Sequence, residues 1–278
     1  MNSFQPDEEL KKNYYGRDLA DKSTWYSEVA QAYNKVRPRY KDELINFAIE
    51  YAQLPKQGKI LEIGCGPGIA TTSFASRGFN LLSLEPNLAA CEIAKNNCAA
   101  YPSVEICPTT LEKWSVKPQE FDAVLAATSL HWVSPDIGYL KISQALKDGG
   151  SLILLWNGEL KPSQKIYQLL KPIYQEFAPS LEPFKPREQE KRYFEAIEKK
   201  VINSGYFHYL KSQQLITEVD YSIDDYLLLL STYSPYIALE KEQRQNLFTA
   251  IKNSLKQVCN NTVSLSYLSL VQVFQVLS

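Results

Sequence analysis

Short apolar runs alternate with amphipathic stretches through the first half of the chain. Five apolar runs are expected to form buried strands, at residues 59–63, 80–84, 103–107, 121–127 and 151–156. Apolar residues at helical spacing predict helices between them, at residues 70–77, 86–100 and 135–146. Strands that are apolar throughout and alternate with helices indicate a parallel sheet covered on both faces. The pattern therefore predicts a doubly wound α/β fold.

The pattern changes after Asn157. Stretches rich in Lys, Glu and Tyr predict helices within residues 162–204, 224–231 and 239–258. Two further strands are expected at residues 207–217 and 262–276. Pro86 and Gly78 are expected to mark helix ends, Pro86 by opening one helix and Gly78 by closing another.

Composition narrows the classes of protein that this chain can represent. Hydrophobic residues make up 45% of the 278 residues, which is enough for a large core. A net charge of −1 gives no reason to expect a nucleic-acid partner, and no apolar run approaches the roughly 18 residues of a membrane span. The polar N-terminus and five cysteines favour a cytoplasmic protein with reduced thiols. The chain has two histidines and no CxxC pair, so we expect no metal site. No obligate protein partner is evident from the sequence.

A cluster of glycines follows the first predicted strand. Gly64, Gly66 and Gly68 stand between that strand and a helix, where glycine lets the backbone turn sharply and approach a ligand closely. Glu85 ends the second strand, 21 positions after Gly64. That offset is close to the roughly 20 residues that separate such a loop from the acid that binds a ribose diol. The loop and Glu85 together predict an adenosine-type ligand.

Glycine spacing decides between two such ligands. A dinucleotide fold requires G-x-G-x-x-G or a final Ala, but position 69 is Ile. The spacing here is G-x-G-x-G, which resembles motif I of the class I methyltransferases that use S-adenosylmethionine (SAM). The segment 110–114 resembles the border of the adenine site in these enzymes, although Thr110 replaces a frequent Asp.

Two more segments narrow the resemblance to type 11 methyltransferases similar to trans-aconitate methyltransferase. Residues 126–132 resemble the Ala-rich version of the fourth strand that ends in His-Trp, and residues 33–40 resemble the N-terminal Tyr…Arg-Pro…Tyr signature, although Lys41 replaces a frequent Pro. The resemblance implies a Rossmann-like sheet of seven strands, mostly parallel with an antiparallel last strand. We expect residues 1–50 to form a helical segment over the site, residues 51–160 the SAM-binding core, and residues 161–278 helical cap insertions and the last strands.

The resemblance also implies which residues hold SAM. They are Tyr33, Glu62, Gly64, Cys65, Gly66, Gly68, Glu85, Pro86, Asn87, Thr110, Leu111, Glu112, Ala127 and Trp132. The sulfonium charge favours aromatic faces, so Trp25, Tyr26, Tyr33 and Trp132 are candidates to line the space around the methyl group. Each could equally be a packing residue.

The methyl acceptor is expected to be a small molecule. His131 is the candidate catalytic residue, as a general base for a hydroxyl or amine, with a purely structural role as the alternative. A carboxylate acceptor needs no base but needs cationic donors, and Arg37 and Arg39 are the candidates, together with Trp25 and Tyr26 as substrate contacts. Surface positions for both arginines remain open.

The favoured function is O-methylation of a carboxylate or hydroxyl group. The alternatives are C-methylation of a quinone or lipid-like acceptor, esterification of a malonyl carrier protein, and SAM binding without catalysis. An NAD-dependent oxidoreductase is disfavoured by Ile69.

Overall fold

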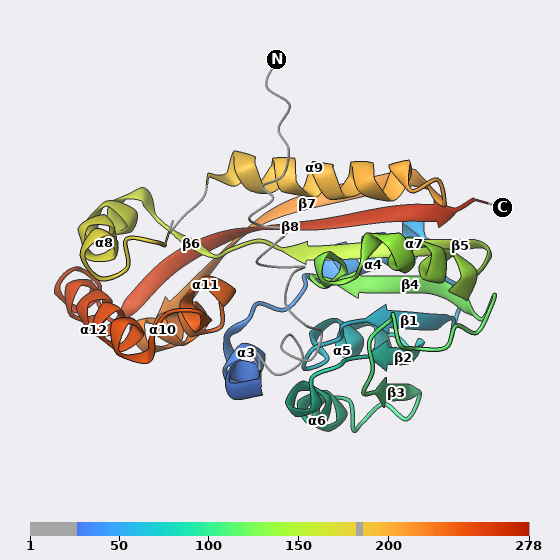
Figure 1. Ribbon diagram of the computed structural model, residues 1–278, viewed down its shortest axis with the longest axis horizontal. Coiled ribbons are helices and arrows are strands. Elements are labelled where there is room, and N and C mark those ends of the chain that lie inside the picture. The colour runs from blue at the N-terminus through green and yellow to red at the C-terminus, as the bar shows by residue number, and fades with distance from the viewer. Residues whose placement is uncertain (1–26, 182–185, 278) are drawn as a thin grey trace, which may run out of the picture.

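One mixed sheet runs through the molecule in a computed structural model that describes residues 27–181 and 186–277 (Figure 1). Trp25 and Tyr26 lie outside the described residues. The strands are β1 (Lys59–Ile63), β2 (Asn80–Leu84), β3 (Val104–Cys107), β4 (Phe121–Ala127), β5 (Leu146–Asn157), β6 (Lys161–Pro162), β7 (Phe207–Ser222) and β8 (Thr262–Val276). Their order is β3-β2-β1-β4-β5-β8-β6, and β7 also pairs with β8. The predicted doubly wound sheet is confirmed.

The strand directions follow the expected plan, with one addition. Strands β1 to β5 pair in parallel, and β8 is antiparallel to both β5 and β7. The sheet has eight strands instead of the expected seven, because Lys161 and Pro162 add a short strand beside β8. The chain leaves β1 toward β2 on one side and reaches β4 on the other, so the switch point lies between β1 and β4.

Helices cover both faces of the sheet. The helices and helical turns are η1 (Ser27–Val29), α3 (Ala30–Val36), α4 (Asp42–Tyr51), α5 (Ile69–Ala75), α6 (Leu88–Asn97), η2 (Leu130–Trp132), α7 (Pro135–Ala145), α8 (Gln164–Phe177), α9 (Arg187–Asn203), α10 (Ile223–Ser231), α11 (Ser234–Ile237) and α12 (Lys241–Val258). Buried side chains of α4 and α5 share one core with β1, β4, β5 and β8. Buried side chains of α7 and α9 form another core with the same strands.

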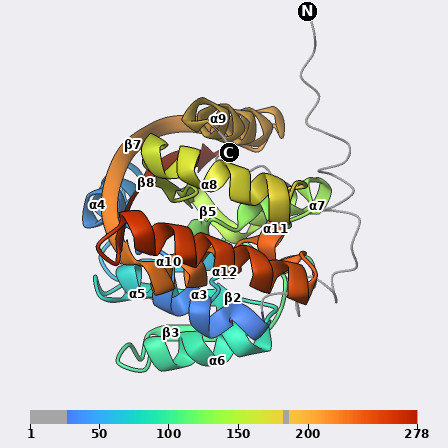
Figure 2. The same cartoon turned by 90° about the vertical axis from the view of Figure 1, so that its left-hand side faces the viewer.

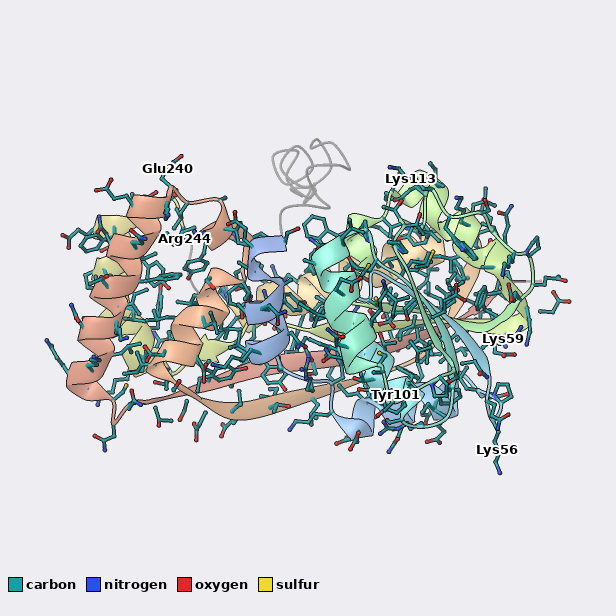
Figure 3. The ribbon with its side chains drawn as sticks, turned by 90° about the horizontal axis from the view of Figure 1, so that it is seen from below. Lys56, Lys59, Tyr101, Lys113, Glu240 and Arg244 are labelled. Carbon is teal, nitrogen blue, oxygen red and sulfur yellow. The ribbon has the colours of Figure 1, made fainter. Side chains whose placement is uncertain are left out.

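A third core lies beyond the sheet proper. The long strands β7 and β8 extend past the other strands, and α8, α10, α11 and α12 pack around that end (Figures 1 and 2). We call this part the helical lobe. In Figure 3, Arg244 of α12 and Glu240, the residue before this helix, lie at one end of the molecule, and Lys59 and Lys113 of the sheet half lie at the other. No helix among the described residues is long and apolar enough to cross a membrane.

Several element boundaries differ from the expectation; strand β7, for example, runs to Ser222 instead of residue 217, and two other differences have a local cause. Helix α6 begins at Leu88, because the Asn87 side chain accepts a hydrogen bond from the Ala90 N–H and caps the helix. Pro86 therefore precedes the cap and does not open the first turn. Strand β5 begins already at Leu146, where it pairs with Phe121 before a register shift.

Candidate functional site

The glycine segment after β1 forms a bend in the left-handed region of backbone space. Gly64, Gly66 and Gly68 have φ angles of +65°, +55° and +82°. The N–H groups of Gly64 and Cys65 both donate to the Leu84 carbonyl, at 2.8 and 3.1 Å. The bend is thereby fixed to the carboxyl end of β2.

The surroundings of the three glycines differ. A Cβ atom on Gly64 would lie 2.8 Å from the Cβ of Ser129, and one on Gly68 would lie 3.4 Å from Ala94. A Cβ atom on Gly66 would meet nothing within 4 Å. Gly64 therefore allows the loops after β1 and β4 to pack together, whereas Gly66 turns bare backbone toward open space. Such a surface suits a ligand that must approach the main chain closely.

Glu85 reaches this bend from the end of β2. One carboxylate oxygen, Oε2, accepts from the Gly66 N–H at 2.9 Å, and Oε1 accepts from the Asn87 N–H at 2.8 Å. The residue is only 8% exposed, and burial raises its pKa while these two hydrogen bonds oppose the rise. Each carboxylate oxygen has a second lone pair and can still accept from a ligand hydroxyl. The predicted pairing of the glycine bend with this acid is present.

Glu62 lies beneath the same bend and is fully buried. Its Oε2 atom accepts from the Thr71 and Ser83 hydroxyls at 2.6 and 3.0 Å, which joins β1 to α5 and β2. Its Oε1 atom has no hydrogen-bond partner among the described residues. Burial raises the pKa of this carboxyl to about 7.

A strained turn follows β4 at the switch point. Thr128 has φ +55°, a conformation that costs energy for a β-branched residue and marks functional sites. Its hydroxyl lies 2.8 Å from the Tyr40 hydroxyl and accepts from the Asn157 N–H at 3.4 Å. The Asn157 side chain donates in turn to the Pro38 carbonyl at 3.1 Å. Ala127, a predicted cofactor contact, is the last residue of β4 directly before this turn.

An aromatic group continues from this turn. The His131 ring lies 5.0 Å from the Trp132 ring and 5.9 Å from the Trp156 ring, between ring centroids. The ring of Phe194, in α9, also contacts Trp156, with 5.6 Å between the ring centroids. Burial lowers the pKa of His131 to about 4, and its Nδ1 atom has no partner among the described residues. His131 is therefore neutral at physiological pH.

The segment after β3 lies next to Glu85. The Glu85 N–H donates to the Cys107 carbonyl at 3.0 Å, so residues 110–112 follow directly beside the acid. Leu111 is 1% exposed, and the Thr110 hydroxyl accepts from the Lys113 N–H at 3.3 Å. The carboxylate of Glu112 accepts a hydrogen bond from the Ser134 N–H at 3.1 Å. This bond does not point the carboxylate toward the bend.

The predicted arginines occupy different settings. The guanidinium of Arg37 lies between the rings of Tyr33 and Tyr233, at 4.8 and 4.1 Å from their centroids. Its Nε and Nη2 atoms donate to the hydroxyl and carbonyl of Thr232, both at 2.9 Å. Arg39 is exposed and donates to the carbonyl and side chain of Asn34. Whether either contacts a substrate stays a prediction.

The described residues contain no disulfide and no cluster suited to a metal ion, and all five cysteines are free. Cys65 is 6% exposed, and burial raises the pKa of its thiol well above the ordinary value. The thiols of Cys91, in α6, and Cys98, directly after it, also have raised pKa values because of burial. These groups are protonated, and they pack against the bend and α6.

Sequence reasoning did not identify several residues that shape this site. They are Thr71, Ser83, Asn97, Thr128, Ser129, Lys141 and Asn157. Asn97, for example, donates to the Pro67 carbonyl at 2.8 Å and to Asn34 at 3.0 Å, which links α6 to the bend and to α3. Their roles depend on contacts between distant segments, and no local pattern marks them.

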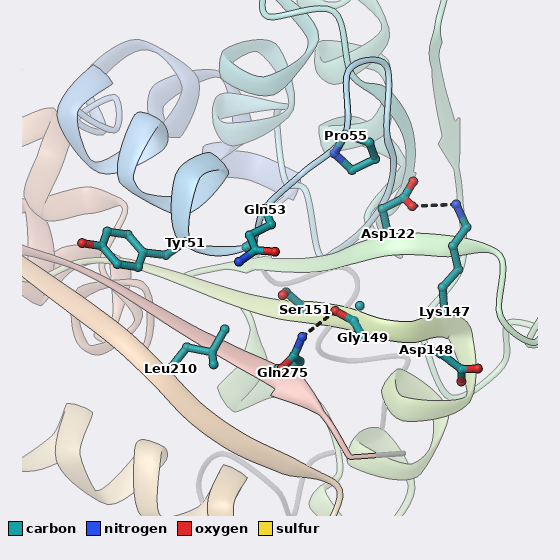
Figure 4. Close-up of a pocket in the computed structure, with 12 residues that line it drawn as sticks. Tyr51, Gln53, Pro55, Asp122, Lys147, Asp148, Gly149, Ser151, Leu210 and Gln275 are labelled. Carbon is teal, nitrogen blue, oxygen red and sulfur yellow. Dashed lines mark hydrogen bonds and ion pairs between the residues drawn. The ribbon is translucent and has the colours of Figure 1, made fainter.

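A separate cavity of about 220 Å³ lies at the opposite edge of the sheet, where β4 and β5 begin (Figure 4). Two pairs of polar groups in its lining are bonded to each other: Lys147 with Asp122 at 2.6 Å, and Gln275 with the Gly149 carbonyl at 3.0 Å. It is distant from the glycine bend, because the carboxyl ends of parallel strands all lie at the other edge. The predicted site residues lie at the bend and not at this cavity.

Comparisons with known proteins identify relatives of this chain. Residues 61–154 match the family model described as a methyltransferase domain. An uncharacterized methyltransferase of Mycobacterium tuberculosis is 29% identical over 137 residues, which cover 49% of this chain and 54% of that protein. The chain thus matches about half the length of this curated relative.

Two further likenesses extend over most of the chain. A putative methyltransferase of Dictyostelium discoideum is 25% identical over 250 residues, 85% of this chain and 87% of that protein. The solved structure of a putative type II methyltransferase from Anaeromyxobacter dehalogenans superposes with a TM-score of 0.63 at 19% identity, over 85% of this chain and 97% of that one. At that identity the structural likeness shows the fold alone.

Proposed function

We propose that this chain, whose residues 61–154 match the methyltransferase-domain model, is a class I SAM-dependent methyltransferase that transfers the methyl group of SAM to an oxygen atom of a small molecule. The observation that carries the proposal is the hydrogen bond of 2.9 Å between the Glu85 carboxylate and the N–H of Gly66. The Glu85 carboxylate can accept hydrogen bonds from sugar hydroxyls. It is bonded to Gly66, the glycine of the bend at which added atoms would meet open space.

The residues around the bend fit SAM. Glu85 would accept hydrogen bonds from the ribose, and the bare backbone of Gly66 would allow the cofactor to lie against it. The unpartnered Oε1 atom of Glu62 is a buried acceptor beneath the bend and suits the cationic amino group of the methionine part. Segment 110–112 would border the adenine beside Glu85.

When bound, SAM supplies an activated methyl group that an acceptor oxygen attacks in line. The chain contributes mainly by placing the acceptor behind that methyl group, an effect worth up to about 7–11 kcal/mol in well-oriented reactions. The turn at Thr128 and the aromatic group of His131 and Trp132 follow β4 at the switch point and would form the wall that holds the acceptor.

The state of His131 favours a carboxylate acceptor over a hydroxyl. A general base works best with a pKa near the operating pH, and burial lowers the pKa of His131 to about 4. A carboxylate is ionised at neutral pH and needs no base. In this role a neutral His131 would act as a hydrogen-bond donor or acceptor to the substrate and would not remove its proton.

Calorimetric titration tests the cofactor part of the proposal. The wild-type chain is expected to bind SAM and S-adenosylhomocysteine but not NAD. The E85Q variant should bind both roughly 10- to 100-fold more weakly, because it loses charge-assisted hydrogen bonds. E92Q is the matched control, since Glu92 is an exposed residue of α6 that pairs only with Lys95 at 2.8 Å. Absence of heat with both SAM and its demethylated product would refute the proposal.

Methyl transfer from labelled SAM to a panel of acceptors tests the substrate part. The panel contains carboxylic acids, phenols and amines of similar size. We expect carboxylic acids to be methylated, with a rate at saturating SAM that stays nearly constant from pH 6 to pH 8 because the acceptor is ionised throughout. Methylation of phenols or amines alone would reject the carboxylate assignment while leaving SAM binding intact.

A further inference from the structure

We propose that Lys141 positions the segment that recognises the adenine of SAM, an inference that rests on the proposed function. Lys141 lies in α7, distant in sequence from the glycine bend, and no motif marks it. Its ammonium group donates to the carbonyls of Leu111, Glu112 and Trp114, at 3.0, 2.7 and 2.8 Å. An ammonium group has three N–H donors, so all of them point into one turn of the chain.

A second contact joins the same turn to α7. The Glu112 carboxylate accepts from the N–H of Ser134, the residue that precedes the first turn of the helix. Segment 110–114 is therefore attached at the start of α7 through Ser134 and farther along it through Lys141. The turn is closed by a hydrogen bond of 2.9 Å from the Trp114 N–H to the Thr110 carbonyl, and the contacts with α7 hold the other carbonyl groups of the turn toward that helix.

The direction of one peptide group follows from the contacts of Lys141. In a planar trans peptide the C=O and the next N–H point to opposite sides. Because the Leu111 carbonyl faces Lys141, the Glu112 N–H points away from α7. This N–H has no acceptor among the described residues, whereas the next one, of Lys113, already donates to the Thr110 hydroxyl at 3.3 Å.

The adenine ring supplies the missing acceptor. Segment 110–112 starts beside Glu85, whose N–H donates to the Cys107 carbonyl at 3.0 Å. A base attached to a ribose at Glu85 would thus lie against this turn, and its N1 atom is an acceptor on the outer edge of the ring. In hypoxanthine N1 carries a proton and cannot accept. Lys141 is accordingly a positioning residue, since it acts through the turn and does not touch the cofactor.

Nucleobase preference provides the test. Calorimetry measures the dissociation constants of S-adenosylhomocysteine and of S-inosylhomocysteine, which differ in the base alone. The wild-type chain should favour the adenosyl compound by at least about 10-fold. In K141M this preference should fall by about 10-fold, because the Glu112 N–H is no longer held toward the base. If K141M fails to fold, K141Q carries the same test, because it removes the charge and leaves fewer donors.

The matched control is K147M. Lys147 also makes a short contact, 2.6 Å to Asp122, but at the opposite edge of the sheet, so its loss should leave the preference unchanged (Figure 4). Equal weakening of both ligands in K141M, with the preference intact, would overturn the inference and show a merely structural role. A wild-type chain that binds neither ligand would instead refute the proposed function itself.

Discussion

Gly66 and Gly78 have similar backbone conformations at different places in the fold. Both have positive φ angles, +55° and +85°, and a Cβ atom on either would meet nothing within 4 Å. An alanine at either position would cost about 1–2 kcal/mol, because a Cβ atom disfavours a positive φ angle. Only Gly66 lies at the proposed cofactor site. The pair therefore separates the strain of the substitution from its effect on the ligand.

We predict that G66A weakens SAM binding by at least about 10-fold and that G78A does not change it. Both variants should lose similar free energy of unfolding, about 1–2 kcal/mol, measured by urea denaturation. SAM affinity is measured by calorimetry. Unchanged affinity in G66A would mean that the ligand does not approach this backbone. G64A should be less stable than either, because its Cβ would lie 2.8 Å from that of Ser129.

The buried carboxyl of Glu62 predicts an unusual pH dependence. Its pKa in the folded chain is about 7, above the ordinary value of 4.5, so the folded state binds this proton more tightly than the unfolded state. Its contribution to stability is complete below about pH 4.5 and is lost as the pH rises to about 7. The shift corresponds to roughly 3 kcal/mol.

The difference in unfolding free energy between the wild type and E62Q isolates this contribution. Urea denaturation at several pH values from 4.5 to 8 should show the wild type losing stability relative to E62Q as the pH rises. A subtraction is needed because His131 acts in the opposite sense: its pKa is lowered to about 4, so its contribution is lost as the pH falls. A difference that is flat with pH would show that Glu62 titrates normally.

Helix α3 connects the two halves of the molecule. On the side of the helical lobe, Lys35 pairs with Asp225 at 2.7 Å and Arg37 bonds Thr232. On the side of the sheet, Asn34 accepts from Asn97 of α6 at 3.0 Å. Because α6 begins three residues after Glu85, the position of α3 is coupled to the proposed cofactor site.

We predict that R37A loosens this connection and that R39A does not. R37A removes two hydrogen bonds and two stacking contacts, which should lower the unfolding free energy by about 1–3 kcal/mol. Hydrogen exchange of the α3 amides should become faster in R37A alone. R39A should stay within about 0.5 kcal/mol of the wild type, because Arg39 is exposed. Equal exchange in both variants would contradict the anchoring role.

Elements defined by local chemistry could be predicted from the sequence. Strand β4 has the predicted bounds, because a run such as Phe121–Ala127 has little use outside a buried strand. The pairing of Glu85 with the glycine bend followed from the offset along a βαβ unit. The start of α6 was misplaced at Pro86, because the stronger capping residue, Asn87, follows it.

Features that depend on distant contacts could not be predicted in this way. Thr128 adopts a left-handed conformation that its own side chain disfavours, and it is stabilised by Tyr40, 88 positions earlier in the chain. Lys141 resembles any other lysine of an amphipathic helix until the turn that holds its three acceptors is known. Such residues become visible only when the fold brings their partners together.

At the scale of the whole molecule, two strands unite the cores. Strand β8 contributes Phe274 to one face of the sheet, Val273 to the other, and Leu265 to the core of the helical lobe. Strand β7 pairs with β8 along its whole length. The helical lobe therefore has no sheet of its own, and its unfolding would release the strands that the sheet half needs. We infer that the two halves unfold in one transition.

The substitution I251A tests this coupling. Ile251 is fully buried in α12 within the helical lobe, and its loss should cost about 2–5 kcal/mol. Three of the four tryptophans, Trp114, Trp132 and Trp156, lie in the sheet half, so tryptophan fluorescence reports mainly on that half. With one transition, I251A lowers the fluorescence midpoint by roughly 5–15 °C.

Circular dichroism at 222 nm, which reports all helices, should give the same midpoint as tryptophan fluorescence in I251A. The control I202A removes a side chain that is 39% exposed on α9 and should shift neither midpoint measurably. Two separated midpoints in I251A, with the fluorescence one at its wild-type value, would show that the helical lobe unfolds alone. In that case α3, which contacts both halves, would have to release one of them at the first transition, and the proposed cofactor site would survive the loss of the lobe.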